Sequence, residues 1–246
     1  MKEFLLIDFS GADGILWEEI AVPNMKVWVI KNCPIDILKF KVQETMLVAM
    51  GTLIDFTLAT TRISEICIPG GVLPSLENLD LLENSVLMQV KHLPSTLVRL
   101  NLQWCYRLKE LINLSNLVNL KFLCINGCYQ LETLNVKGLT SLEEIQAEGC
   151  MQLKTLINLS NLVHLKFLLI NRCHQLEALN VEGLTSLEEI QVSECKKLKS
   201  IQGLSQLERL KCLGLSSNTD VMWNDICNFL VSILLVQGLV FDYTPM

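Results

Sequence analysis

Residues 111–146 read LINLSNLVNLKFLCINGCYQLETLNVKGLTSLEEIQ, and residues 156–191 read LINLSNLVHLKFLLINRCHQLEALNVEGLTSLEEIQ. The two stretches start 45 residues apart and are identical at 30 of 36 positions. A sequence that repeats at a fixed period indicates a chain built from stacked copies of one structural unit.

A shorter period lies inside this duplication and is marked by cysteine. Five cysteines follow one another at intervals of 23, 22, 23 and 22 residues: Cys105, Cys128, Cys150, Cys173 and Cys195. Apolar residues stand eight, five and three positions before each cysteine, and a leucine stands three positions after it, as Leu120, Leu123, Ile125 and Leu131 do around Cys128. Alternate apolar positions predict a strand with inward-facing side chains. One unit cannot cover its own apolar side, so the units are expected to stack.

The period of 22–23 residues lies within the range of leucine-rich repeats. It predicts an α/β leucine-rich-repeat solenoid, a horseshoe with a parallel β-sheet on its concave face. A coil this short has little room for an α-helix on its convex face, so short 3-10 or turn segments are expected there, with Ser115 and Ser160 as caps. Degenerate copies extend the array to about ten repeats. The position of the cysteine forms a structural ladder of Cys33, Thr61, Asn84, Cys105, Cys128, Cys150, Cys173, Cys195 and Asn218, with a weaker first copy at Ala12.

The domain organisation follows from the spacing of these copies. No proline-rich or charged linker interrupts the chain, so residues 1–246 are expected to form a single leucine-rich-repeat domain. Residues 1–72 hold irregular repeats, and residues 73–218 hold regular repeats of 21–23 residues. Residues 219–246 combine helical apolar spacing, a glycine and a short apolar run, which predicts a C-terminal capping helix and strand.

The ladder cysteines are interpreted as structural. Each would stand where the backbone leaves the strand and turns, so its backbone groups need partners, and a small side chain with a weak donor suits that corner. Asn84, Asn218 and Thr61 are polar alternatives at the same position. No C-x-x-C pair occurs and the three histidines lack zinc spacing, so no metal is expected. Stacking brings the ladder positions within disulfide range, but inward-facing thiols should stay reduced.

Composition excludes several classes of function. The net charge is −6 and there is no long basic run, which disfavours nucleic acid as a partner. The N-terminus lacks a signal-peptide pattern, and the most apolar stretch, 226–241, is too interrupted for a membrane span. Ten cysteines without a secretion signal suggest a reducing compartment, so a cytoplasmic location is expected. No phosphate loop, dinucleotide motif or nucleophile motif occurs, so neither a cofactor nor an enzymatic activity is expected.

The outward-facing strand positions are expected to form columns on the concave face. One column has alternating charge, which favours a cross-strand ion-pair ladder: Lys121, Glu143, Lys166, Glu188 and Lys211. Two neighbouring columns, and the positions just before the ladder cysteine, contain aromatic, arginine and leucine residues that protein-binding surfaces use. These tentative ligand-binding residues are Arg99, Trp104, Phe122, Phe167, Leu169 and Arg172, with Phe122, Phe167 and Leu169 expected to be exposed. The alternative is that they only pack against neighbouring side chains.

Segments such as LVRLNLQWCYRLKEL (97–111) and LEEIQVSECKKLKSI (187–201) resemble the leucine-rich-repeat region of plant intracellular immune receptors. The resemblance covers residues 73–218 well. It implies a repeat domain that follows a nucleotide-binding domain, holds it inactive and recognises pathogen effectors. The chain departs from that family in lacking the proline that often follows the second leucine after the cysteine, and residues 1–246 contain no nucleotide-binding motif.

Several functions therefore remain open. The chain is expected to be a protein-binding module, with ligand or effector recognition in an immune-receptor-like protein as the first hypothesis. Its partner would be a protein ligand or other domains of a longer receptor. The alternatives are a free-standing scaffold or substrate-recruiting adaptor, and a truncated receptor fragment without independent function. An upstream phosphate loop in the same gene would favour the receptor hypothesis. The oligomeric state does not follow from the sequence.

Overall fold

The structure is a computed structural model that describes residues 2–8, 24–33, 51–68, 71 and 73–215. The predicted C-terminal cap at 219–246 and the predicted ladder positions Ala12 and Asn218 lie outside the described residues. The division at residues 72 and 218 therefore stays a prediction, while the repeats between 73 and 215 can be followed coil by coil.

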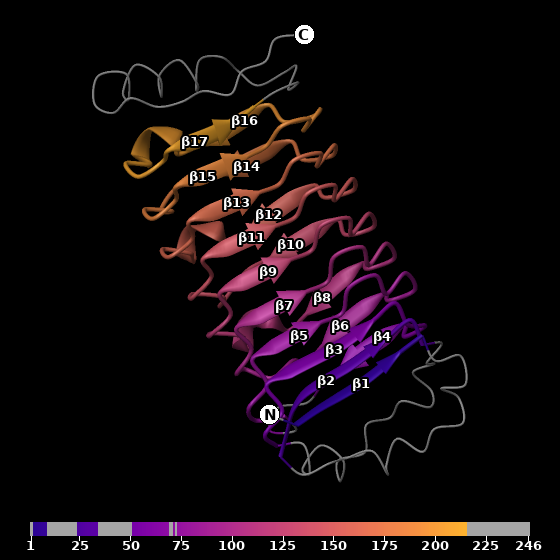
Figure 1. Cartoon of the computed structure of the whole chain (residues 1–246). Coiled ribbons are helices and arrows are strands. Elements are labelled where there is room, and N and C mark those ends of the chain that lie inside the picture. Colours follow the sequence, from indigo (N-terminus) through magenta and orange to yellow (C-terminus); the bar gives the residue numbers. More distant parts are fainter. Residues whose placement is uncertain (1, 9–23, 34–50, 69–70, 72, 216–246) are drawn as a thin grey trace.

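The main element is a ten-stranded, all-parallel β-sheet that runs the length of the stack (Figure 1). The strands of this sheet follow one another in chain order. Most are only three residues long, because the chain then leaves the sheet and its next apolar residues enter the core. In order across the sheet the strands are β1 (Lys2–Ile7), β2 (Met25–Lys31), β3 (Asp55–Ala59), β5 (Asn78–Asp80), β7 (Arg99–Asn101), β9 (Phe122–Cys124), β11 (Glu144–Gln146), β13 (Phe167–Leu169), β15 (Glu189–Gln191) and β17 (Cys212–Gly214).

The strands occur where the leucine pattern predicts them. One strand ends shortly before each of the eight ladder positions that the structure describes, from Cys33 to Cys195. The central residue of each short strand points inward, so Leu123, Ile145 and Leu168 are paired in register and fully buried. A parallel pair is joined by a crossover, and here the rest of each coil is that crossover.

The opposite side of the coils carries short strands that the sequence did not predict. They form three small parallel sheets, β4–β6–β8, β10–β12 and β14–β16. Their bounds are β4 (Glu65–Cys67), β6 (Gln89–Lys91), β8 (Glu110–Ile112), β10 (Thr133–Asn135), β12 (Thr155–Ile157), β14 (Ala178–Asn180) and β16 (Ser200–Gln202). We call this side the back face and the outer surface of the ten-stranded sheet the front face. Figure 1 shows nearly parallel coils, so the predicted horseshoe curvature is slight, because strands on both sides have similar spacing.

The predicted 3-10 turns are present, at Leu114–Asn116, Leu159–Asn161 and Leu204–Gln206. The predicted caps are wrong, because Ser115 and Ser160 lie inside these turns. Asn113 and Asn158 occupy the cap positions in a left-handed backbone conformation and form no side-chain cap bond. No α-helix occurs in the part of the chain that the structure describes.

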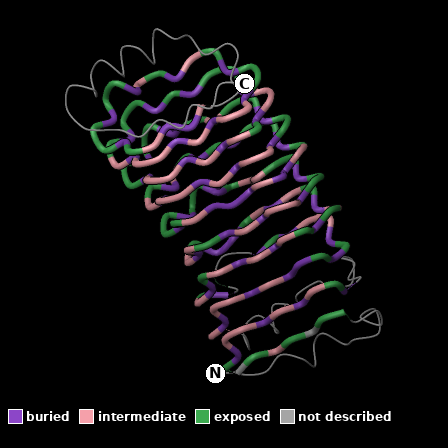
Figure 2. Tube along the Cα trace, turned by 45° about the horizontal axis from the view of Figure 1, so that its top comes forward, coloured by how far each residue is buried: buried purple, intermediate pink, exposed green. Residues whose placement is uncertain are grey.

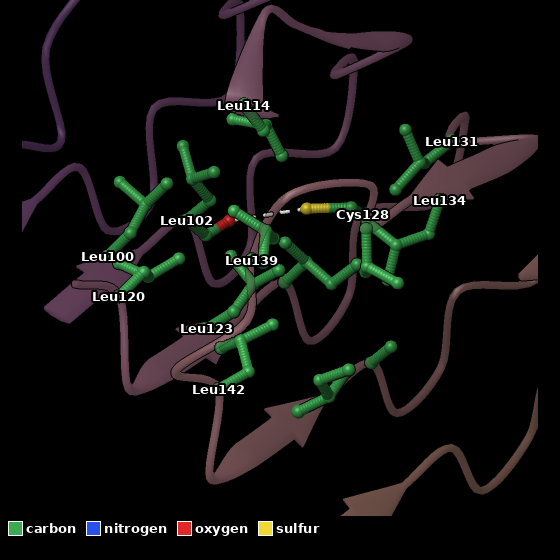
Figure 3. Packing of buried hydrophobic residues seen from close by; sticks show 14 of the residues in the cluster. Leu100, Leu102, Leu114, Leu120, Leu123, Cys128, Leu131, Leu134, Leu139 and Leu142 are labelled. Carbon is green, nitrogen blue, oxygen red and sulfur yellow. Dashed lines mark hydrogen bonds between the residues drawn. The ribbon is translucent and has the colours of Figure 1, made fainter. Parts of the chain in front are cut away.

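The core is one continuous column of apolar side chains along the axis of the stack. Figure 2 shows that buried residues recur at the same places in successive coils. Leucines of neighbouring coils, such as Leu100, Leu123 and Leu142, meet in the interior (Figure 3) and have no solvent exposure. At the N-terminal end the leucines give way to aromatic packing, with Trp28 stacked on Phe56 at a centroid distance of 5.2 Å.

The cysteine ladder lies inside this core and bonds one coil to the previous one. The thiol of Cys128 donates to the backbone carbonyl of Leu102 at 3.2 Å (Figure 3), and the thiol of Cys150 donates to that of Ile125 at 3.1 Å. Cys105, Cys173 and Cys195 make the equivalent contacts with Leu81, Ala147 and Ile170.

At the polar ladder positions, amide and hydroxyl groups take the place of the thiol. The Asn84 amide donates to the carbonyls of Leu58 and Leu81 at 2.6 and 2.8 Å, and its oxygen accepts from the backbone and hydroxyl of Thr61. These contacts give Asn84 and Thr61 hydrogen-bond partners inside the core.

A left-handed corner precedes every described ladder position. The residue there has a φ between +53° and +70° in all eight coils, at Asn32, Thr60, Glu83, Trp104, Gly127, Gly149, Arg172 and Glu194. A side chain at such a φ costs about 1–2 kcal/mol relative to glycine. Only two of the eight are glycine, so the stacking of the coils imposes the corner on whatever residue stands there.

Burial predicts which thiols react. No disulfide joins the nine cysteines of the described ranges, and Cys67 is exposed while the ladder thiols are buried. Burial raises the pKa of the Cys105 and Cys150 thiols to about 12, which suppresses the reactive thiolate. We expect iodoacetamide to modify Cys67 in the native protein and to modify Cys105, Cys128, Cys150, Cys173 and Cys195 only after denaturation. Peptide mapping by mass spectrometry measures this, and rapid native labelling of Cys128 would contradict the buried ladder.

Candidate binding surface

The front face presents the outward side chains of the ten-stranded sheet in columns. Strand register aligns Arg99 with Phe122, Phe122 with Glu144, Glu144 with Phe167, and Phe167 with Glu189, and we call this the central column. The neighbouring column contains Asn101, Cys124, Gln146, Leu169 and Gln191. Both columns agree with those expected from the repeat, so the period determined which side chains are adjacent in space.

Three of the four contacts of the predicted ion-pair ladder are present, just before strands β9 to β17, and the described residues show no pair between Lys166 and Glu188. Glu143 accepts from Lys166 at 2.7 Å and from Lys121 at 3.2 Å, and Glu188 pairs with Lys211 at 2.6 Å. The hydrogen bond from Lys166, and then that from Lys121, lowers the pKa of the Glu143 carboxyl. We call Lys121, Glu143, Lys166, Glu188 and Lys211 the outer column. Its charges neutralise one another, so the column keeps the surface polar but offers little net charge to a ligand.

The N-terminal half of the front face is hollowed into a shallow groove of about 530 Å³. The guanidinium carbon of Arg99 lies 4.1 Å from the centroid of the Phe122 ring, and both side chains line the groove. The amide of Asn78 donates to Asp55 at 2.6 Å, and that of Asn101 donates to Asp80 at 3.0 Å. The groove is thus a polar site lined by Phe122 and by the more deeply buried Phe56, able to contact the backbone and side chains of a peptide.

Phe122, Phe167 and Leu169 are half-buried, not exposed as the sequence predicted. The reason is the close stacking of coils, which lets neighbouring outward side chains cover part of each ring. Phe167 lies between Glu144 and Glu189, whose oxygens accept from the amides of Gln146 and Gln191 at 2.5 and 3.0 Å. Of the predicted binding residues, the structure brings Arg99 and Phe122 together, and it places Phe167 and Leu169 together on β13 two coils further along.

Trp104 and Arg172 are left-handed corner residues at the rim of the front face. Arg172 is exposed and pairs with Glu194 of the next coil at 3.0 Å. Trp104 packs over Gly127 and belongs to an aromatic cluster with Tyr106 and Tyr129, whose rings are stacked at 5.2 Å.

The two tyrosines of this cluster were missed from sequence. The signal was available, since each directly follows a ladder cysteine in successive coils, at Cys105-Tyr106 and Cys128-Tyr129. Equivalent positions of stacked coils are neighbours in space, so aromatics repeated at this position had to meet.

Two further classes of site are not seen in the described ranges. Among residues 2–8, 24–33, 51–68, 71 and 73–215, no three histidine, cysteine or acidic side chains are grouped so that they could hold a metal ion. The same ranges contain no helix that is long and apolar enough to cross a membrane.

The coil of 22–23 residues, the buried leucine positions and the all-parallel sheet define the class of protein, a leucine-rich-repeat solenoid. Neither a protein-family model nor a curated protein matches the chain.

Three solved structures are similar to this chain. TLR13 in complex with ssRNA13 is 15% identical with a TM-score of 0.36, and the match covers 88% of this chain but only 40% of the TLR13 chain. An internalin from Listeria monocytogenes is 15% identical with a TM-score of 0.31, over 100% of this chain and 88% of the internalin. A leucine-rich repeat protein from Bacteroides ovatus is 12% identical with a TM-score of 0.25, over 91% of this chain and 79% of that protein. At these values the likeness carries no functional conclusion.

Gly127 and Gly149 provide a matched test of the Trp104 packing. Both have left-handed φ values, +70° and +69°, but a Cβ at Gly127 would lie 2.2 Å from the Trp104 ring, whereas one at Gly149 meets nothing within 4 Å. Gly127→Ala should therefore lower the free energy of unfolding by about 1–3 kcal/mol more than Gly149→Ala, as overpacking does. Urea unfolding measures the difference, which should disappear in a Trp104→Ala background. Equal effects of the two alanines would show that Trp104 does not rest on Gly127.

Glu143 provides a pH test of the ion-pair ladder. Its pKa is lowered by Lys166 and Lys121, so its charge stabilises the fold above the unfolded pKa, and this contribution is lost as the pH falls through the folded pKa. The native protein should have a higher urea midpoint than Glu143→Gln at about pH 7, and the gap should close by about pH 3. Glu177→Gln, which removes an exposed carboxylate just before β14, should show a smaller gap at about pH 7 and none at about pH 3. A gap that widens in acid would contradict the pairing.

Proposed function

We propose that the chain is a protein-binding leucine-rich-repeat module that uses its front face. The observation that carries this proposal is the pair formed by Arg99 and Phe122 in the groove. The core is already complete without these outward side chains, because the inward position of each strand, such as Leu100 or Leu123, is fully buried. A large ring and a guanidinium kept together at a hollow are the residue types that dominate protein-binding energy.

A protein fits this surface better than a nucleic acid does. From β3 to β17, the central column and its neighbour contain four carboxylates, Asp55, Asp80, Glu144 and Glu189, against one cation, Arg99. Phosphate backbones require the opposite balance. The side-chain amides of Asn78 and Asn101 also line the groove and can form hydrogen bonds with a peptide backbone. We therefore propose that the partner is a peptide segment of another protein or of a further domain.

The finer proposal is recognition of a ligand or effector by an immune-receptor-like protein. Its support is the resemblance of the repeat unit in residues 97–111 and 187–201 to plant intracellular receptors. A cytoplasmic location is part of this proposal and is supported by the ladder thiols, whose bonds to backbone carbonyls need the reduced form. We propose a binding role, and not a catalytic one, for the front face.

An unbiased selection tests the proposal. The purified chain is presented to a displayed library of random peptides, and the enriched clones are measured against two variants. Arg99→Ala/Phe122→Ala removes the groove pair, and Lys154→Ala/Thr155→Ala alters exposed back-face residues as a control. We expect the groove variant to weaken binding by about tenfold or more, as hot-spot truncation does, and the control to leave it within about twofold. Clones that respond equally to both variants would argue against a front-face site.

A further inference from the structure

Aromatic rings and carboxylates alternate along the central column. In register, Phe122, Glu144, Phe167 and Glu189 follow one another on β9, β11, β13 and β15. Adjacent parallel strands are about 4.8 Å apart, so the backbones of the two glutamates lie at about that distance on either side of the Phe167 backbone. A negative charge on both sides of a ring is an arrangement that attracts a cation to the ring face.

The protein already fills one such position with its own cation. Arg99 lies over Phe122 at 4.1 Å, at the N-terminal end of the column. Phe167 has a different environment, because both of its in-register neighbours are acidic. Within the described residues, neither Glu144 nor Glu189 forms an ion pair, and each receives an amide from the glutamine two residues later.

The adjacent glutamates make the contrast clear. Glu143 and Glu188 directly precede Glu144 and Glu189 in the chain, and both are paired with lysines of the neighbouring coils. Those pairs neutralise the outer column, so the negative charge of the front face is concentrated on the central column. Glutamine amides leave that charge in place, since they donate hydrogen bonds without adding a positive charge.

We propose that Phe167, Glu144 and Glu189 form a site for an arginine or lysine side chain of a protein partner. The guanidinium or ammonium group stacks on the Phe167 ring and is bonded by one or both carboxylates, and Leu169 contacts its aliphatic stem. The partner is an extended basic segment that lies along the central column. This inference rests on the proposed front-face function and names the chemistry of its ligand.

Charge complementarity supports this occupant over an acidic or neutral one. The central column and its neighbour together carry four carboxylates. Two of these, Asp55 and Asp80, stand on β3 and β5 at the groove. A basic segment that begins at Phe167 and continues toward β3 passes Arg99, which lies over the Phe122 ring, and then meets these two carboxylates. An acidic segment would be repelled along the same path.

The test uses a fluorescein-labelled peptide of alternating serine and arginine, and the same peptide with citrulline in place of arginine. Citrulline keeps the shape of the side chain and removes its charge. Fluorescence polarisation should show binding of the arginine peptide alone, weakened by added salt. Glu144→Gln/Glu189→Gln should weaken it about tenfold, and Phe167→Leu about threefold. The matched control is Glu177→Gln/Glu182→Gln, two exposed carboxylates on either side of β14 on the back face that change the net charge equally.

The outcomes separate this inference from the proposed function. Equal weakening by the front and back glutamine variants would show general attraction to a protein of net charge −6 and would overturn the site. Failure of the arginine peptide to bind would overturn it as well. Library clones that need Arg99 and Phe122 but contain no basic residue would leave the front-face function standing and refute the basic-segment inference. Circular dichroism of each variant establishes that a loss of binding is not a loss of fold.

Discussion

The structure depends on one constraint: no coil can bury its own leucines. An inward residue such as Leu123 loses its solvent exposure only because the coils before and after it close over it. Stability is therefore shared between neighbours, and each coil must repeat the backbone of the previous one closely enough for its carbonyls to be met. The ladder contact satisfies that need, since the thiol of one coil bonds a carbonyl of the coil before it.

The same constraint explains why unusual residues stand at the corners. A tryptophan, an arginine and two glutamates adopt the left-handed conformation at Trp104, Arg172, Glu83 and Glu194, where two other coils use glycine. The stacking energy of the leucines outweighs the local cost, so the side chain at the corner is free to differ between coils. Variation is consequently displayed on the rim and the front face while the interior stays uniform, and binding specificity can differ without any change in the core.

The repeat period made much of the candidate surface predictable. Residues 45 positions apart, such as Phe122 and Phe167, had to stand two coils apart in one column. The alternation of lysine and glutamate in the sequence predicted the ion pairs of Glu143. Prediction failed where the local pattern was ambiguous. Thr133-Leu134-Asn135 is too short and polar to be recognised as a strand, and it becomes one only because Thr155-Leu156-Ile157 pairs with it. Ser115 was assigned as a cap from its residue type, but the left-handed Asn113 takes that place.

The sequence by itself determined the class of fold, the position of each main-sheet strand, the inward leucines, the ladder and the adjacency of outward side chains, because all of these follow from a period that repeats along the chain. The tertiary structure decided the back-face sheets, the degree of burial of Phe122, Phe167 and Leu169, and the contact of Arg99 with the Phe122 ring. These properties depend on how closely two coils approach and which rotamers fit between them. That distance is set by the packing of the whole stack, and a one-dimensional pattern does not contain it.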